Sequence, residues 1–213
     1  MKKTNWLKCT DGPVLLTEGD NDCHVIVALC GAHNVKQTFG FYSCGSDDQA
    51  IRRLELLLKG SNCPTSIGIV LDADAPSLAS KWHRLTALLT DKGYTLPAQP
   101  SEEGTVLTVD DLPKLGIWLM PDNKTDGMLE DFCLTLAPAG ALKHTQQYLN
   151  EAKAQGYAKY KDVHIAKALI HTFLGTQDEP GSPIGQAITR KVLSPTEPSA
   201  TVFTNWLKST FDA

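Results

Sequence analysis

The run Ser66–Leu71, SIGIVL, restricts the fold more than any other stretch of the chain. Its residues are small or apolar at both alternating sets of positions, so both faces of an extended strand here would avoid water. Two-sided burial is typical of a central strand in a parallel sheet that carries helices on both faces. The sequence therefore predicts an α/β fold built around this strand.

Apolar periodicities of about two and about 3.6 residues alternate along much of the chain. They predict strands at Val14–Thr17, Val35–Ser43, Ser66–Leu71, Val106–Val109 and Leu115–Met120, and helices at Asp22–Cys30, Gln49–Leu58 and Ser77–Asp91. Because a helix separates most of these strands, we expect a mostly parallel, Rossmann-like sheet with helices on both faces.

The C-terminal part of the chain has a different pattern. It predicts helices at Met128–Leu136, Leu142–Ala154, Val163–Leu174 and Phe203–Phe211, interrupted by Gly-, Pro- and Ser-rich breaks at Gly175–Pro183 and Ser194–Ser199. We therefore expect two parts, an α/β core over residues 1–136 and a helical extension over residues 137–213 that packs on the core.

Composition restricts the classes of function and the cellular locations that suit the chain. The 213 residues carry a formal net charge of −4, which argues against a sequence-independent grip on nucleic acid through a basic face. An acidic site that meets phosphates through divalent cations stays compatible with this charge. The six cysteines form no C-x-x-C pair, and no apolar run is long enough to span a bilayer. We expect a soluble, cytoplasmic protein with no membrane partner.

Acidic residues follow three of the predicted strands. Glu18 follows the first, Asp72 and Asp74 follow the central one, and Asp122 follows the last. Ligands of open parallel sheets bind at the carboxyl ends of the strands, so these side chains are expected at one edge. Crowded carboxylates repel one another unless a cation joins them, and their oxygens suit Mg²⁺. Taken singly, acids such as Asp22 are more often helix caps or turn residues.

Three segments resemble the Toprim superfamily: LLTEGDND (Leu15–Asp22), GIVLDAD (Gly68–Asp74) and IWLMPDNKTDGMLEDF (Ile117–Phe132). The Toprim pattern is a strand that ends in Glu-Gly, followed by a later strand that ends in D-x-D. Within the superfamily the chain is similar to a small stand-alone bacterial group, akin to the Toprim part of overcoming-lysogenisation-defect nucleases. The resemblance covers about Val14–Phe132 and implies a Toprim-like core.

The resemblance also implies roles for individual residues. Glu18 would be the general acid or base, or a metal ligand, and Asp72 and Asp74 would bind Mg²⁺ or Mn²⁺. Asp22 falls where such proteins carry a second acid. The chain departs from many Toprim proteins at Ala75, where a glycine often follows the D-x-D motif.

Three further positions match less closely. Asp122 and Glu130 fall on the third acidic motif and would bind a second ion. Lys167 would place a positive charge beside the scissile phosphate, as a lysine does in related nucleases; surface lysines of solvated helices look the same in sequence.

The residues and the resemblance together predict a divalent-metal-dependent nuclease that acts on DNA or RNA. Two alternatives remain. The chain has no Walker motif, so it would also suit a non-catalytic or partner-dependent subunit that works with a separately encoded ATPase. A haloacid-dehalogenase-like phosphatase would also use D-x-D, with Asp72 as its nucleophile, although that motif normally lies on the first strand.

Overall fold

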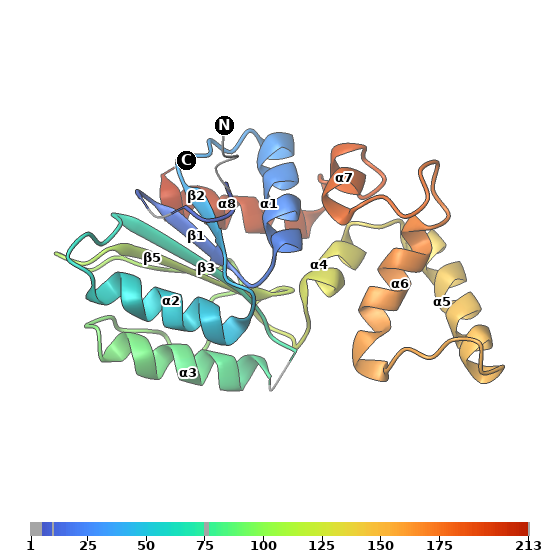
Figure 1. The fold of residues 1–213 in the computed structure, drawn as a ribbon, viewed down its shortest axis with the longest axis horizontal. Helices are drawn as coiled ribbons and strands as arrows, with labels where there is room; N and C mark the ends of the chain where they lie inside the picture. The colour runs from blue at the N-terminus through green and yellow to red at the C-terminus, as the bar shows by residue number, and fades with distance from the viewer. Residues whose placement is uncertain (1–5, 10, 75–76, 213) are drawn as a thin grey trace.

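The computed structural model describes residues 6–9, 11–74 and 77–212. Its centre is a five-stranded sheet in the order β2-β1-β3-β5-β4 (Figure 1). The strands are β1 Val14–Thr17, β2 Gly40–Ser43, β3 Ser66–Asp72, β4 Thr105–Leu107 and β5 Lys114–Met120. The pairs β1–β2, β1–β3 and β3–β5 are parallel, and the edge strand β4 is antiparallel to β5. The expected mostly parallel α/β fold is confirmed.

Helices cover both faces of the sheet. They are α1 Asp20–His33, α2 Asp47–Lys59, α3 Leu78–Thr90, α4 Leu129–Thr135, α5 Ala139–Ala154, α6 Ile165–Leu174, α7 Ile184–Thr189 and α8 Pro198–Phe211, with a short 3₁₀ turn η1 at Asp162–His164. Figure 1 shows α2 and α3 on one face, α1 and α8 on the other, and α4 to α7 beyond one end of the strands. No helix in the described ranges is both long enough and apolar enough to cross a membrane.

The central strand β3 separates two apolar cores, as its two-sided composition predicts. Ile67, Ile69 and Leu71 face the core under α2 and α3, whereas Val70 faces the core under α1 and α8. All four side chains are fully buried. The strand therefore contributes to both layers, and the residues that follow it emerge at the middle of the sheet edge.

Helix α8 lies directly on the sheet, although it comes from the expected C-terminal extension. Gly68 and Gly116 allow this approach. A Cβ at Gly116 would lie 2.2 Å from Thr210 Oγ1, and one at Gly68 would lie 2.9 Å from the ring of Phe211. Glycine removes the side chain that would otherwise hold the helix away.

Several element bounds differ from those expected. Helix α1, expected over Asp22–Cys30, runs instead from Asp20 to His33, where Asn34 ends it in the left-handed conformation. Strand β2 is confined to Gly40–Ser43, and α7 was not expected at all. Helix α7 is only six residues long, and it forms because its apolar side packs against α1.

Candidate active site

A cavity of about 600 Å³ opens at the carboxyl ends of β1 and β3, next to the first turns of α1 and α4. Its ionisable lining residues are mostly acidic and are listed together here: Glu18, Asp20, Asp22, Asp72, Asp74, Glu130, His164 and Lys167. The parallel strands explain this gathering, because their carboxyl ends meet at one edge of the sheet. We call this cavity the acidic pocket.

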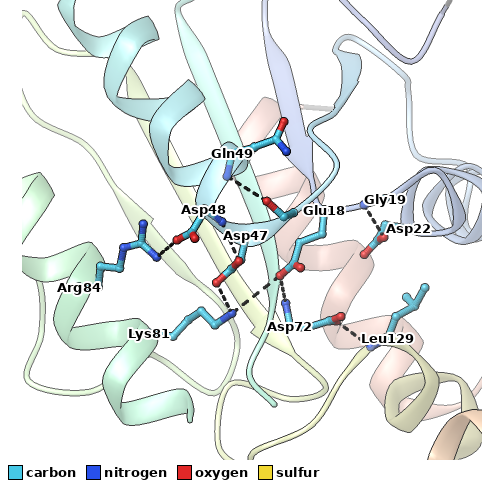
Figure 2. A network of polar contacts seen from close by, with 11 residues as sticks. Glu18, Gly19, Asp22, Asp47, Asp48, Gln49, Asp72, Lys81, Arg84 and Leu129 are labelled. Carbon is cyan, nitrogen blue, oxygen red and sulfur yellow. Dashed lines mark hydrogen bonds and ion pairs between the residues drawn. The ribbon is translucent and has the colours of Figure 1, made fainter. Parts of the chain in front are cut away.

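Glu18 lies between β1 and α1 and faces the end of β3. Its Oε1 accepts a hydrogen bond of 2.8 Å from the backbone N–H of Asp72, and Lys81 Nζ lies 4.0 Å away (Figure 2). Burial raises the pKa of Glu18, although the Asp72 N–H and the Lys81 charge oppose the rise. The hydrogen bond fixes the carboxylate at the junction of two strands that are 54 residues apart in the chain.

Asp22 has a structural role and also lines the acidic pocket. Its Oδ2 accepts a hydrogen bond of 3.0 Å from the backbone N–H of Gly19, the N-cap residue of α1. Burial raises the pKa of Asp22 to about 7, and the charges of Glu18 and Glu130 add to the effect. The cap therefore holds a carboxyl group in the pocket that is reluctant to ionise.

The two D-x-D carboxylates both line the acidic pocket, and Ala73 between them is buried. Asp72 Oδ1 accepts a hydrogen bond of 2.9 Å from the backbone N–H of Leu129, at the start of α4. Burial raises the pKa of Asp72 to about 8, with further contributions from the charges of Asp22 and Glu18. Asp74 is exposed. The motif thus offers one carboxylate held by the fold and one in contact with water.

Glu130 and Lys167 also line the acidic pocket, where they form an ion pair. Glu130 is buried in the first turn of α4, and Lys167 Nζ on α6 lies 3.3 Å from its Oε1. Lys167 is therefore in the pocket, where its charge partner is one of the predicted metal ligands.

Asp122 lies outside the acidic pocket. Its Oδ1 accepts hydrogen bonds from the backbone N–H groups of Lys124 and Thr125 and from the Thr125 hydroxyl, so it closes a turn after β5. Asn123 holds this turn against the end of β5, because its Oδ1 accepts a hydrogen bond from the Leu119 N–H. The turn directs Asp122 toward another cavity, which it lines with Glu102 and Ser199.

Other acids near the pocket are helix caps. Asp126 Oδ1 accepts a hydrogen bond of 2.8 Å from the N–H of Leu78, and Asp131 Oδ2 accepts one of 2.9 Å from the N–H of Met128. These bonds satisfy N–H groups at the starts of α3 and α4, which have no partner within their own helix.

Sequence reasoning missed Lys81 and Asp47. Lys81 on α3 is only 4 % exposed, and its Nζ lies 2.8 Å from Asp47 Oδ2 on α2, between Asp47 and Glu18 (Figure 2). Burial opposes ionisation of Asp47, but the hydrogen bonds from Lys81 and from the Asp48 N–H, together with the charges of Lys81 and Arg84, outweigh it, so the pKa of Asp47 is lowered. A signal was present: Lys81 occupies the same helical register as the buried Leu85 and Leu89.

The donor chemistry of the pocket fits Mg²⁺ or Mn²⁺, because carboxylate oxygens are the ligands that these ions prefer. Within residues 6–9, 11–74 and 77–212, no three His, Cys, Asp or Glu side chains are grouped closely enough to hold a metal ion as they stand. Mg²⁺ commonly takes one or two protein carboxylates and keeps several waters, so a site of that kind does not need three converging side chains.

Comparison with known proteins places the chain in a family. Searches of curated proteins and of solved structures found no match. One family matches residues 12–212, a range that includes every strand of the sheet and all eight helices named above. The chain therefore belongs to the family described as "Protein of unknown function (DUF3226)".

Proposed function

We propose that this protein is a divalent-metal-dependent, Toprim-like nuclease that cleaves phosphodiester bonds of DNA or RNA. One observation carries the proposal. Glu18, Asp72 and Asp74, which follow two different parallel strands, line a single pocket at the carboxyl edge of the sheet. The order of these residues, Glu-Gly first and D-x-D later, is the order that the Toprim resemblance leads us to expect.

The electrostatics of the pocket support a cation. Burial raises the pKa of Glu18. It also raises the pKa of Asp22 to about 7 and that of Asp72 to about 8. A fold that places several such carboxyl groups together loses stability when they ionise, unless a positive charge offsets their repulsion. Lys167 supplies one charge, but its ammonium is directed at Glu130.

The residues of the pocket suggest a division of roles. A bound Mg²⁺ or Mn²⁺ would stabilise negative charge on the phosphoryl oxygens. Glu18, whose pKa is raised by burial, is a better proton acceptor than an exposed glutamate and would take a proton from the attacking water. Lys167 would leave Glu130 and pair with the phosphate. Lys81 would keep Glu18 oriented through its charge, because it approaches Oε1 from the side of α3.

Activity of point variants tests the proposal. Purified protein would be incubated with Mg²⁺ or Mn²⁺ and single- or double-stranded DNA and RNA. We expect Glu18→Gln and Asp72→Asn to lower the cleavage rate by about 10²- to 10⁴-fold. Asp122→Asn is the matched control, since Asp122 lies outside the pocket. Equal cleavage by wild type and both pocket variants would rule the proposal out.

Mn²⁺ binding without cleavage would favour the alternative of a partner-dependent subunit. If binding required Asp72 but no substrate were cut, the separately encoded ATPase of that alternative would be the next component to add. Metal binding and turnover are therefore measured on the same preparations.

We also propose a cytoplasmic location. All six cysteines are free thiols, and burial raises the pKa of both Cys23 and Cys30 to about 12, which makes these two unreactive. Free thiols are typical of proteins in reducing compartments. Titration of six thiols in denatured protein prepared without reductant would agree with this location.

A further inference from the structure

The helical hairpin formed by α5 and α6 is basic, whereas the whole chain is acidic. Residues 139–174 contain five lysines and two acids, a net charge of 5 − 2 = +3, in a chain of −4. The five lysines are Lys143, Lys153, Lys159, Lys161 and Lys167. The lysine and the histidine that line the acidic pocket, Lys167 and His164, both belong to this hairpin. The hairpin therefore supplies the lysine of the pocket lining, Lys167.

The segment that joins the two helices, residues 155–161, reads QGYAKYK. Tyr160 is half-buried, with Lys153 Nζ 4.9 Å from its ring centroid, and Lys153 also pairs with Asp162. These contacts brace the segment. Tyr157, by contrast, is 80 % exposed, so its ring contributes little to packing and is open to a ligand.

This segment adjoins the acidic pocket. The backbone N–H of His164, which lines the pocket, donates a hydrogen bond of 2.8 Å to the carbonyl oxygen of Lys161. Lys159 and Lys161 are exposed, and neither forms an ion pair with any residue that the structure describes. Their charges are available to an anion that enters the pocket from this side.

We propose that Tyr157, Lys159 and Lys161 form a platform that binds single-stranded nucleic acid and leads it to the acidic pocket. This inference rests on the proposed function and names its substrate class. Aromatic side chains stack on unpaired bases of any sequence, and lysines between them contact the phosphates. A duplex keeps its base faces inside the helix, so Tyr157 would gain nothing from it. The exposed ring of Tyr157 beside Lys159 and Lys161 thus favours a single strand.

Binding is measured separately from cleavage, in Glu18→Gln protein without divalent metal. The probes are fluorescein-labelled 20-nucleotide single strands of DNA and RNA and a 20-base-pair DNA duplex, followed by fluorescence anisotropy. We expect Tyr157→Ala to weaken binding of the single strands about ten- to hundredfold, Tyr157→Phe to retain it, and binding of the duplex to change less than twofold. The double variant Lys159→Gln/Lys161→Gln should reduce the salt slope by about 1.4, about 0.7 for each lysine.

Tyr148→Ala is the matched control. Tyr148 is 62 % exposed on the same hairpin, but it lines a different cavity together with Thr172 and Phe173. If Tyr157→Ala binds the single strands no more weakly than Tyr148→Ala, or loses the duplex as strongly, the platform is wrong and Tyr157 faces another kind of partner, such as a protein.

The two proposals fail in different ways. Cleavage that requires Glu18 but is indifferent to Tyr157 would keep the nuclease and overturn the platform. Binding of single strands through Tyr157 without any metal-dependent cleavage would keep the platform and overturn the nuclease.

Discussion

Asp72 ends the central strand β3, where ionisation of its carboxyl group costs stability. The N–H of Leu129 donates a hydrogen bond to Oδ1, but burial and the charges of Asp22 and Glu18 raise the pKa to about 8. An asparagine would accept the same hydrogen bond without having to ionise. An acid at this position therefore suits a site that binds a cation better than it suits a metal-free fold.

Asp72→Asn is expected to stabilise the metal-free protein in a pH-dependent way. The folded state keeps the Asp72 proton up to about pH 8, whereas the unfolded chain releases it near 3.8, so stability falls as pH rises through this window. The variant lacks this loss. Its advantage in free energy of unfolding should grow from near zero below pH 4 to about 2–4 kcal/mol above pH 8. Urea denaturation in EDTA measures it, and a variant less stable than wild type at pH 8 would contradict it.

Lys81 is a buried lysine, and its charge is offset by Asp47 and Glu18. Replacing it by methionine keeps much of the volume but leaves Asp47 and Glu18 without their shared cation. Because Asp47 is about a quarter exposed, we expect Lys81→Met to cost about 1–3 kcal/mol, less than for a fully buried pair. If Lys81 positions Glu18, kcat should fall about tenfold or more while KM changes little.

The pair Arg84–Asp48 provides the control for Lys81. It joins the same two helices, α3 and α2, but on the exposed side, so Arg84→Gln should change stability by less than about 0.5 kcal/mol and leave kcat unchanged. The double variant Lys81→Met/Asp47→Asn should regain stability without regaining kcat. Recovery of both would make Lys81 a purely structural residue.

At the scale of elements, local sequence pattern predicted those helices and strands whose formation depends on local interactions. Strand β3 begins at Ser66 as expected, and the helix expected at Gln49–Leu58 forms as α2, which Ser46 caps. Packing decided the rest. Helix α7 was missed because its six residues are stable only against α1, where a Cβ at Gly185 would lie 2.7 Å from the carbonyl oxygen of His24. No short-range pattern carries that contact.

The candidate site was likewise predictable only in part from the sequence. Glu18, Asp72 and Asp74 reach one pocket because parallel strands bring their ends together, which follows from topology alone. Asp122 also follows a parallel strand, but the turn that Asn123 holds after β5 keeps Asp122 out of the acidic pocket. Lys81 reaches Glu18 only through the packing of α3 beside α2, so its role depends on tertiary structure.

The contact between α8 and the sheet yields a prediction for Gly116. A Cβ there would meet Thr210 Oγ1 at 2.2 Å and Thr210 Cβ at 2.9 Å, so Gly116→Ala must displace α8. We expect a loss of about 1–3 kcal/mol in thermal or urea unfolding. Thr210→Ala in the same chain should relieve part of this loss, since it removes Oγ1 and Cγ2, the two atoms closest to the added Cβ.

Gly140 is the control for this substitution. It lies near the start of α5 with open space around its Cβ position, so Gly140→Ala should be neutral or slightly stabilising. If Gly116→Ala behaved like Gly140→Ala, α8 would not be held against β5 as closely as the structure indicates.

At the scale of the whole molecule, charge is divided between the acidic edge of the sheet and the basic hairpin α5–α6. The rest of the chain carries −4 − 3 = −7 when the hairpin is set apart. Such a division suits a protein that attracts a polyanion with the basic hairpin and binds cations at the acidic edge of the sheet. A divalent ion bound in the pocket as proposed would compete with protons for the same carboxylates.

Metal binding should therefore release protons. At pH 7 Asp72 is largely protonated and Asp22 about half protonated in the metal-free fold, because their pKa values are about 8 and about 7. A divalent ion bound by these carboxylates must displace those protons, so its affinity should rise steeply between pH 6 and pH 8.

Calorimetric titration with Mn²⁺ in two buffers of different ionisation enthalpy counts the protons, and we expect between one and two. Saturating Mn²⁺ at about 100 times its Kd should then stabilise the wild type by about 2.7 kcal/mol and leave Asp72→Asn unchanged. Proton release below about 0.5 per ion would place the metal away from Asp22 and Asp72.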